Sequence, residues 1–95
     1  MSYTFTAPVK DPAAVLDHGM DWTDELDDGE TISGQPSVIA VPAGLTIAAV
    51  NAANGIVSWR VSGGTAGQAY IATCRITTST GRVLELSVRY PVRER

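Results

Sequence analysis

The sequence predicts an all-β protein, a sandwich of two antiparallel sheets with about seven short strands. Apolar and polar residues alternate with a period of two in residues 70–77 and 83–90, which is typical of half-buried strands. Gly, Pro, Asn or Ser interrupts the chain roughly every ten residues, a spacing that favours short strands joined by turns. No stretch has the period of a long amphipathic helix. A small closed Greek-key β-barrel is the alternative.

The N-terminal residues 1–12 are expected to form an extended or partly mobile arm, or a short edge strand. Pro8 and Pro12 support this expectation, because proline cannot donate a hydrogen bond to a sheet ladder. A helix over residues 11–22 is the rival interpretation, since an N-cap residue followed by proline is typical of a helix start. At most one helical turn is expected there. Residues 13–95 are expected to form a single domain, because a chain of 95 residues has the usual size of one domain.

The first half of this expected domain contains three strand runs, which cover residues 15–22, 30–41 and 45–51. Pro36 interrupts the second run and predicts an edge strand or a bulge there. The apolar stretch 38–50 is expected to supply a surface patch if part of it is exposed. The side chains expected to point inward are Leu16, His18, Met20, Trp22, Ile32, Ile39, Val41, Leu45, Ile47 and Ala49.

The second half contains three further strands with strong turn signals between them. Asn54-Gly55 leads into the run 56–61, and Asn-Gly is the strongest short hairpin signal. Tyr70 is expected to pack its ring inward while its hydroxyl group reaches loop backbone, as buried tyrosines usually require. The expected inward side chains are Val57, Trp59, Val61, Tyr70, Ala72, Cys74, Ile76, Leu84, Leu86, Val88 and Tyr90.

Charge, cysteine content and hydropathy argue against several classes of protein. The net charge is −3, from 10 acidic and 7 basic residues, whereas nucleic-acid binders usually carry a basic excess or a basic face. Cys74 is the single cysteine, so the chain forms no intrachain disulfide. The most apolar stretch is too short to span a bilayer, and no secretory signal is expected at the start. We therefore expect no nucleic-acid partner and no membrane partner.

The residue types do not form a pattern typical of an enzyme. His18 is the only histidine and lies between two apolar residues of its predicted face. It is interpreted as a sheltered or interface residue, because a catalytic base needs a positioned partner. Cys74 is interpreted as an inert buried thiol. The glycine-rich run 62–67 lacks the Gly-Lys-Ser/Thr ending of a phosphate loop. We expect no catalytic residue and no cofactor.

An acidic turn follows the first confident strand. Asp24, Asp27 and Asp28 form a weak candidate for a calcium site, since loop carboxylates bind Ca²⁺ at the ends of sandwiches. The match to a helical calcium loop is poor, because Gln35 occupies the position of the bidentate glutamate. The other interpretation is a solvated acidic loop that keeps an exposed edge from pairing with a neighbour.

Several short motifs, in order along residues 10–95, resemble one known family. The first half contains Lys10-Asp11-Pro12, Leu16-Asp17, Asp21-Trp22 and Asp28-Gly29-Glu30-Thr31-Ile32. The second half contains Val41-Pro42-Ala43-Gly44-Leu45-Thr46, Ser62-Gly63-Gly64-Thr65-Ala66-Gly67-Gln68 with Tyr70, Cys74-Arg75-Ile76-Thr77-Thr78-Ser79 with Gly81-Arg82, and Arg93-Glu94-Arg95. Together they resemble the small phage and prophage proteins described as fibre–tail adaptor or head–tail region proteins. The resemblance implies an immunoglobulin-like β-sandwich and carries no catalytic motif.

The same resemblance implies a non-enzymatic assembly module in the tail or fibre-adaptor region of a phage or prophage particle. Its expected partners are phage tail, connector or fibre proteins, and a homo-oligomer in the particle is a further expectation. The expected location is the host cytoplasm during assembly and then the virion. The alternative is an immunoglobulin-like module that binds a sugar or a cell surface. The candidate contact residues are Asp21, Asp24, Asp28, Pro36, Arg93 and Arg95.

Overall fold

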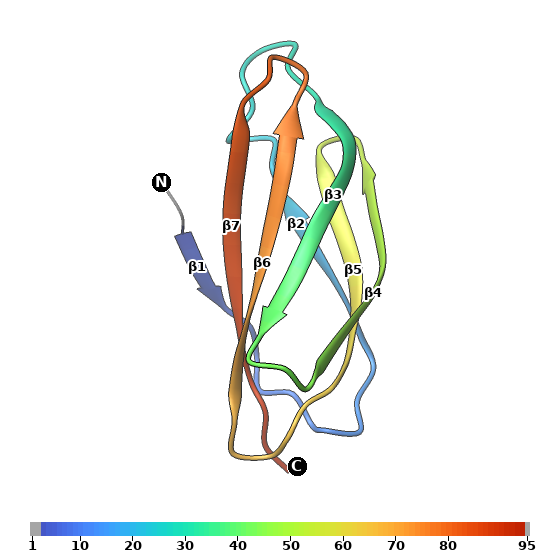
Figure 1. Ribbon diagram of the computed structural model, residues 1–95, viewed down its shortest axis with the longest axis vertical. Helices are drawn as coiled ribbons and strands as arrows, with labels where there is room; N and C mark the ends of the chain where they lie inside the picture. Colours follow the sequence, from blue (N-terminus) through green and yellow to red (C-terminus); the bar gives the residue numbers. More distant parts are fainter. Residues whose placement is uncertain (1–2, 95) are drawn as a thin grey trace.

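The computed structural model describes residues 3–94, which form seven β-strands and no helix. The strands are β1 (Tyr3–Thr6), β2 (Leu16–Asp21), β3 (Ile32–Val41), β4 (Leu45–Ala53), β5 (Ile56–Gly63), β6 (Ala69–Thr78) and β7 (Val83–Pro91). They lie in two layers along the long axis of the molecule (Figure 1). The β-sandwich predicted from the alternation is therefore confirmed. No helix of the described part is long and apolar enough to cross a membrane.

The two sheets are open, so the sandwich has four edge strands. The larger sheet has the order β1-β7-β6-β3, and the smaller has the order β2-β5-β4. Every strand pair is antiparallel except β1 with β7, which is parallel. Residues 3–6, expected as part of an arm or as a short edge strand, form the edge strand β1. The strand that contains Pro36 is also an edge, as predicted, and its ladder with β6 slips between Ser33 and Ser37.

The core lies between the sheets and comes mainly from β5, β6 and β7. Its largest side chains include Trp59, Tyr70 and Tyr90, each no more than 2% exposed. The indole Nε1 of Trp59 donates a hydrogen bond to the Tyr90 hydroxyl group at 3.1 Å. All inward residues predicted for these three strands are buried except Leu84, which is half-buried and packs against the core.

The inward face of β3 differs from the prediction. The sequence predicts that Ile39 and Val41 point inward, but they are 64% and 57% exposed. The pairing explains this, because Val38 lies opposite the buried Cys74, and directly paired residues share one face of a sheet. Residues 38–41 are all apolar, so they carry no alternation from which the inward parity can be predicted.

The inward face of β4 changes part-way along the strand. Ala49 is predicted to point inward, but it is exposed and has a φ of 55°. Between Ala48 and Asn51 the ladder advances by three residues on β4 and by two on β5. One extra residue reverses the parity of a strand. Val50 therefore packs against the core in place of Ala49.

The start of β2 also differs from the prediction. Leu16 is 43% exposed and His18 is half-buried, while Met20 and Trp22 are buried as predicted. The rival helix over residues 11–22 does not form. The Asp11 carboxylate instead accepts a hydrogen bond from the N–H of Ala13 at 2.8 Å, and its carbonyl accepts one from Ala14 at 3.0 Å. Such an Asx turn reverses the chain without starting a helix.

Candidate functional site

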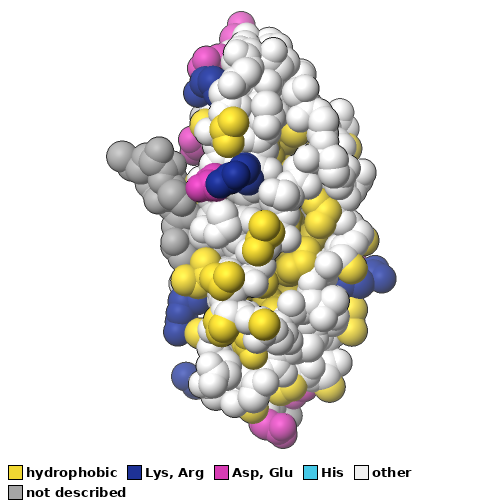
Figure 2. Space-filling model, viewed as in Figure 1, with side chains coloured by type: hydrophobic (Ala, Val, Ile, Leu, Met, Phe, Trp, Pro, Cys, Tyr) yellow, Lys and Arg dark blue, Asp and Glu magenta, His cyan; other side chains and the backbone are white. Residues whose placement is uncertain are grey.

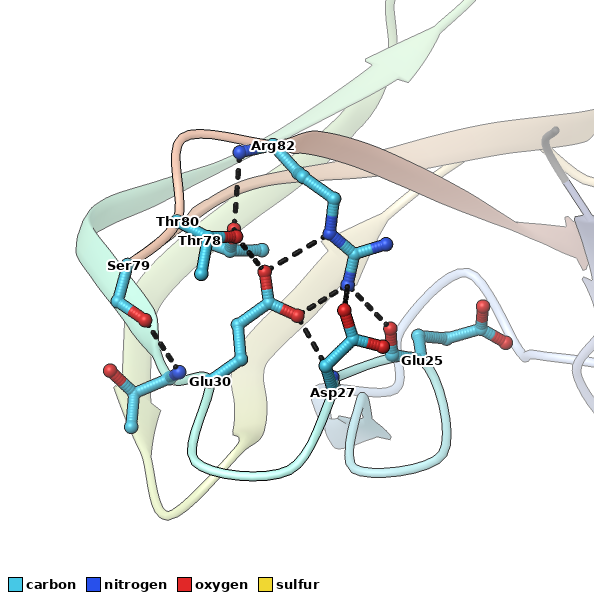
Figure 3. A network of polar contacts seen from close by, with 8 residues as sticks. Glu25, Asp27, Glu30, Thr78, Ser79, Thr80 and Arg82 are labelled. Carbon is cyan, nitrogen blue, oxygen red and sulfur yellow. Dashed lines mark hydrogen bonds and ion pairs between the residues drawn. The ribbon is translucent and has the colours of Figure 1, made fainter.

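One buried carboxylate joins the acidic loop to the β6–β7 turn (Figure 3). The side chain of Glu30 is 1% exposed. Its two oxygens accept hydrogen bonds from the Arg82 guanidinium, with 3.0 Å between Nε and Oε2. The Thr80 hydroxyl group donates to Oε2, and the N–H of Asp27 donates to Oε1 at 2.8 Å. The Arg82 guanidinium, with smaller help from the hydroxyl groups and this N–H, holds the pKa of Glu30 well below its usual value.

The same network fixes the backbone at this end of the sandwich. Nη2 of Arg82 donates to the carbonyl oxygen of Glu25 at 3.1 Å. The Ser79 N–H donates to the Thr31 carbonyl at 2.8 Å, and the Thr31 N–H donates to the Ser79 hydroxyl group at 3.0 Å. Sequence reasoning missed this joint because Glu30 and Arg82 are 52 residues apart. We interpret the network as a structural joint, since both carboxylate oxygens already accept hydrogen bonds.

The three carboxylates of the calcium candidate are not gathered into one site. Asp24 and Asp28 are exposed, and Asp27 faces Arg82, with 3.7 Å between Oδ2 and Nη2. A guanidinium so close to a carboxylate opposes binding of a cation there. Among residues 3–94 no group of three or more His, Cys, Asp or Glu side chains is arranged to hold a metal ion.

The opposite end of the sandwich is closed by a buried lysine. Lys10 is 1% exposed, and its Nζ donates to the carbonyl oxygens of Gly63 at 2.7 Å and Asp11 at 2.9 Å. Burial lowers the pKa of Lys10. Arg93, a predicted contact residue, is exposed beside this lysine and donates its N–H to the Lys10 carbonyl at 2.9 Å. Arg95, the other predicted arginine, lies outside the described residues.

Apolar side chains gather on the outside of the larger sheet (Figure 2). We define the outer apolar face as Ile39, Val41 and Ile71, which are 64%, 57% and 38% exposed. Val41 and Ile71 are directly paired across β3 and β6. The face borders a shallow hollow of about 360 Å³, whose polar rim includes an ion pair between Arg75 and Glu85. Exposed apolar patches with a polar rim are typical of protein contact sites.

A second hollow lies between β1 and β2, where the sandwich is open at one side. We define this edge groove by Phe5, His18, Met20 and Val88, which line a volume of about 320 Å³ together with Gly19 and Asp21. Phe5 is 53% exposed. The imidazole of His18 lies 5.1 Å from the Trp59 ring, and burial lowers its pKa. His18, predicted to be a sheltered or interface residue, is thus half-buried in this groove.

The predicted contact residues fall at different places in the fold. Asp21 is exposed at the end of β2, and its carboxylate accepts hydrogen bonds from the N–H and hydroxyl group of Thr23 at 2.9 and 2.7 Å. Asp24 and Asp28 are exposed in the acidic loop. This loop, which precedes β3, lies at the end of the sandwich opposite the C-terminal end of β7 (Figure 1). The side chain of Pro36 is buried. The structure therefore does not bring these residues together into one surface.

Comparison with known proteins supplies the family. No curated protein matches the chain. The model of one family, described as podophage GP4 fiber-tail adaptor protein gp77, matches residues 10–91. This range includes the buried Lys10, all of β2 and both partners of the Glu30–Arg82 joint. Because the match covers most of the 95 residues, the chain belongs to the podophage fibre–tail adaptor family represented by gp77.

Proposed function

We propose that this protein is a non-enzymatic adaptor in a phage tail, and that it works by binding neighbouring tail, connector or fibre proteins. The family match over residues 10–91 carries this proposal. The protein is made in the host cytoplasm and then becomes part of the virion. The outer apolar face and the edge groove are the surfaces best suited to contacts with other proteins, because both expose apolar side chains.

The two side chains with the most reactive chemistry support a role without catalysis. Cys74 is 0% exposed, and burial raises the pKa of its thiol to about 11. Since the thiolate is the nucleophile, such a cysteine is unreactive at neutral pH. His18 packs against the rings of Trp59 and Tyr90. No hydrogen bond from its imidazole to a carboxylate is found among the described residues, so no group orients it as a base.

We further propose that the sandwich is immunoglobulin-like. Its sheets β2-β5-β4 and β3-β6-β7, with β1 beside β7, place the strands as in the two sheets of that fold. Tyr70 is the second residue of β6, and its hydroxyl group accepts a hydrogen bond from the Thr65 N–H at 2.9 Å. This contact has the geometry of the tyrosine corner, in which a tyrosine at this position bonds to backbone a few residues upstream.

Cross-linking in purified particles tests the adaptor proposal. Lys10 is the only lysine and is buried, so amine-reactive reagents are poorly suited to this chain. A dihydrazide that joins activated carboxylates is suited to it, because Asp24 and Asp28 are exposed. We expect the protein to copurify with particles and to form cross-links to a tail, connector or fibre protein. Its absence from particles, or its presence there without any cross-link to those proteins, would contradict the proposal.

A further inference from the structure

Three of the four sheet edges carry features that hinder the addition of another strand. β3 and β4 both contain register shifts, and β3 also contains a proline. β1 has only four residues. Bulges, prolines and short strands are common ways to protect an edge. β2, by contrast, pairs with β5 over six residues without a shift, so its outer edge is regular.

The phase of the β2–β5 ladder shows which backbone groups face outward. Hydrogen-bonded pairs alternate with non-bonded pairs along an antiparallel ladder. The N–H of Trp22 donates to the carbonyl oxygen of Gly55 at 2.8 Å, so the even-numbered residues of β2 bond to β5. The N–H and C=O groups of Asp17, Gly19 and Asp21 therefore face away from β5. Outside the ladders, no hydrogen bond to these backbone groups is found in residues 3–94.

Gly19 is at the centre of this edge, and the fold does not require glycine there. Its φ is not positive, and a Cβ atom would meet only Cγ2 of Ile56, at an ordinary contact distance of 3.8 Å. Glycine in the interior of a strand weakens it and often marks the close approach of another backbone. A glycine with no internal role is therefore consistent with a partner strand at this edge.

The side chains on either side of this edge differ in chemistry. Asp17 and Asp21 are exposed beside Gly19. The Asp17 carboxylate is paired with Arg60, at 2.9 Å between Oδ1 and Nε, whereas no ion pair to Asp21 is found among residues 3–94. On the other side, His18 and Met20 line the edge groove, and its lining also includes Gly19 and Asp21. A strand added to β2 would place alternate side chains in the groove and beside the carboxylates. Apolar residues suit the groove, and Lys or Arg suits the carboxylates.

A second copy of the chain fits this edge poorly. Antiparallel pairing of two β2 strands about Gly19 would set Asp17 of each copy opposite Asp21 of the other. Like charges directly opposite each other destabilise a strand pair. Arg60 offsets part of the Asp17 charge, but the Asp21 charge has no such partner among residues 3–94. The remaining negative charge therefore favours a foreign, basic strand over self-association.

We propose that β2 is the docking strand of the adaptor, and that its free edge binds an extended segment of a different tail protein in which apolar residues alternate with Lys or Arg. The segment adds a strand to the β2-β5-β4 sheet by main-chain hydrogen bonds, and its apolar residues enter the edge groove. This inference rests on the proposed function and specifies the surface by which the adaptor binds.

Two substitutions of Gly19 separate docking from folding. Gly19→Pro removes an N–H that faces away from β5, so the ladder keeps its bonds while the outer edge loses a central donor. Gly19→Ala keeps that N–H and is the matched control. Particles are assembled with each variant, and the adaptor content per particle is measured by quantitative mass spectrometry. We expect wild-type content for Gly19→Ala and at least a tenfold loss for Gly19→Pro, with both free proteins folded by circular dichroism.

A further variant covers the case in which Gly19→Pro fails to fold. Asp17→Asn with Asp21→Asn removes both charges but keeps oxygens for the contacts to Arg60 and Thr23, and we expect at least a threefold loss of particle content. Wild-type content for folded Gly19→Pro, or for the double variant when Gly19→Pro does not fold, would overturn the docking assignment alone. A β2-paired dimer of the free protein would also overturn it. Absence of the wild-type protein from particles would instead contradict the proposed function.

Discussion

Alkaline conditions are expected to destabilise this fold through Cys74, and alanine at this position should remove part of that sensitivity. Burial raises the pKa of the Cys74 thiol from 9.0 to about 11, although the nearby Trp22 indole opposes the shift. The unfolded chain therefore loses this proton near pH 9 and the folded chain only near pH 11. A group with a raised folded pKa contributes stability that is complete below the unfolded pKa and is lost as pH rises through the folded pKa.

The magnitude follows from the difference between the two pKa values. Each unit of pKa corresponds to about 1.4 kcal/mol, so the thiol accounts for a loss of about 3 kcal/mol once pH exceeds both values. At pH 11, where the folded thiol is half ionised, the loss is about 2 kcal/mol. Burial also raises the pKa of Tyr90, from 10.0 to about 12, and this adds a loss at higher pH. Lys10 acts in the opposite direction, because its folded pKa is lowered.

The comparison of wild type with Cys74→Ala isolates the thiol, since both proteins contain Tyr90 and Lys10. Urea unfolding at pH 8 and at pH 11 gives the free energy of unfolding of each. The truncation itself lowers stability at both pH values by a constant amount. We expect the wild-type advantage to shrink by about 2 kcal/mol between pH 8 and pH 11. Equal losses of stability by the two proteins over this range would show that ionisation of the buried thiol does not destabilise the fold.

Three further predictions test other parts of the fold. Tyr70→Phe removes the acceptor for the Thr65 N–H and should lower the free energy of unfolding by about 1–3 kcal/mol, which a thermal melt would detect as a fall of several degrees; an unchanged Tm would contradict the corner contact. Ala49→Gly should stabilise by up to about 1 kcal/mol, because glycine tolerates the φ of 55° that alanine does not, whereas Ala48→Gly in the regular ladder should destabilise. Glu30→Gln should be less stable than wild type at neutral pH, and this gap should narrow as pH falls below 4.5, since the folded pKa of Glu30 lies below that value and its contribution is lost on protonation. A gap that stays constant in urea titrations from pH 7 to pH 2 would show that the Glu30 charge does not stabilise the fold.

The strands with clear alternation were predictable from sequence, because each has one apolar and one polar face. In β5, Val57, Trp59 and Val61 are at most 1% exposed. The residues between and after them are polar or charged, and only Ile56, next to the hairpin turn, breaks the alternation. In β3, by contrast, either parity of residues 38–41 would present an apolar face. The register with β6 decides between them, and that register depends on contacts distant in sequence.

The candidate surfaces were harder to predict because they depend on how distant segments meet. The acidic residues of loop 23–29 all look alike in sequence, yet Asp27 faces a guanidinium while Asp24 and Asp28 face solvent. The edge groove forms only where Phe5 of β1 lies across from β2. Pro36 was the candidate contact residue on a predicted edge strand, but that strand is bulged and its proline is buried. That β2 is a regular edge could not be predicted from sequence, because it follows from the strand order and from the register with β5.

An adaptor that joins two proteins needs contact surfaces that do not compete with each other. The outer apolar face belongs to β3 and β6, whereas the edge groove lies beside β1 and β2, and β7 separates β1 from β6 in the larger sheet. Both ends of the sandwich are held by charged side chains, Lys10 at one end and the Glu30–Arg82 pair at the other. These contacts hold the loops at both ends of the sandwich in place, so the two surfaces lie on a stable fold. A partner strand on β2 would therefore leave the outer apolar face free for a second protein, as bridging requires.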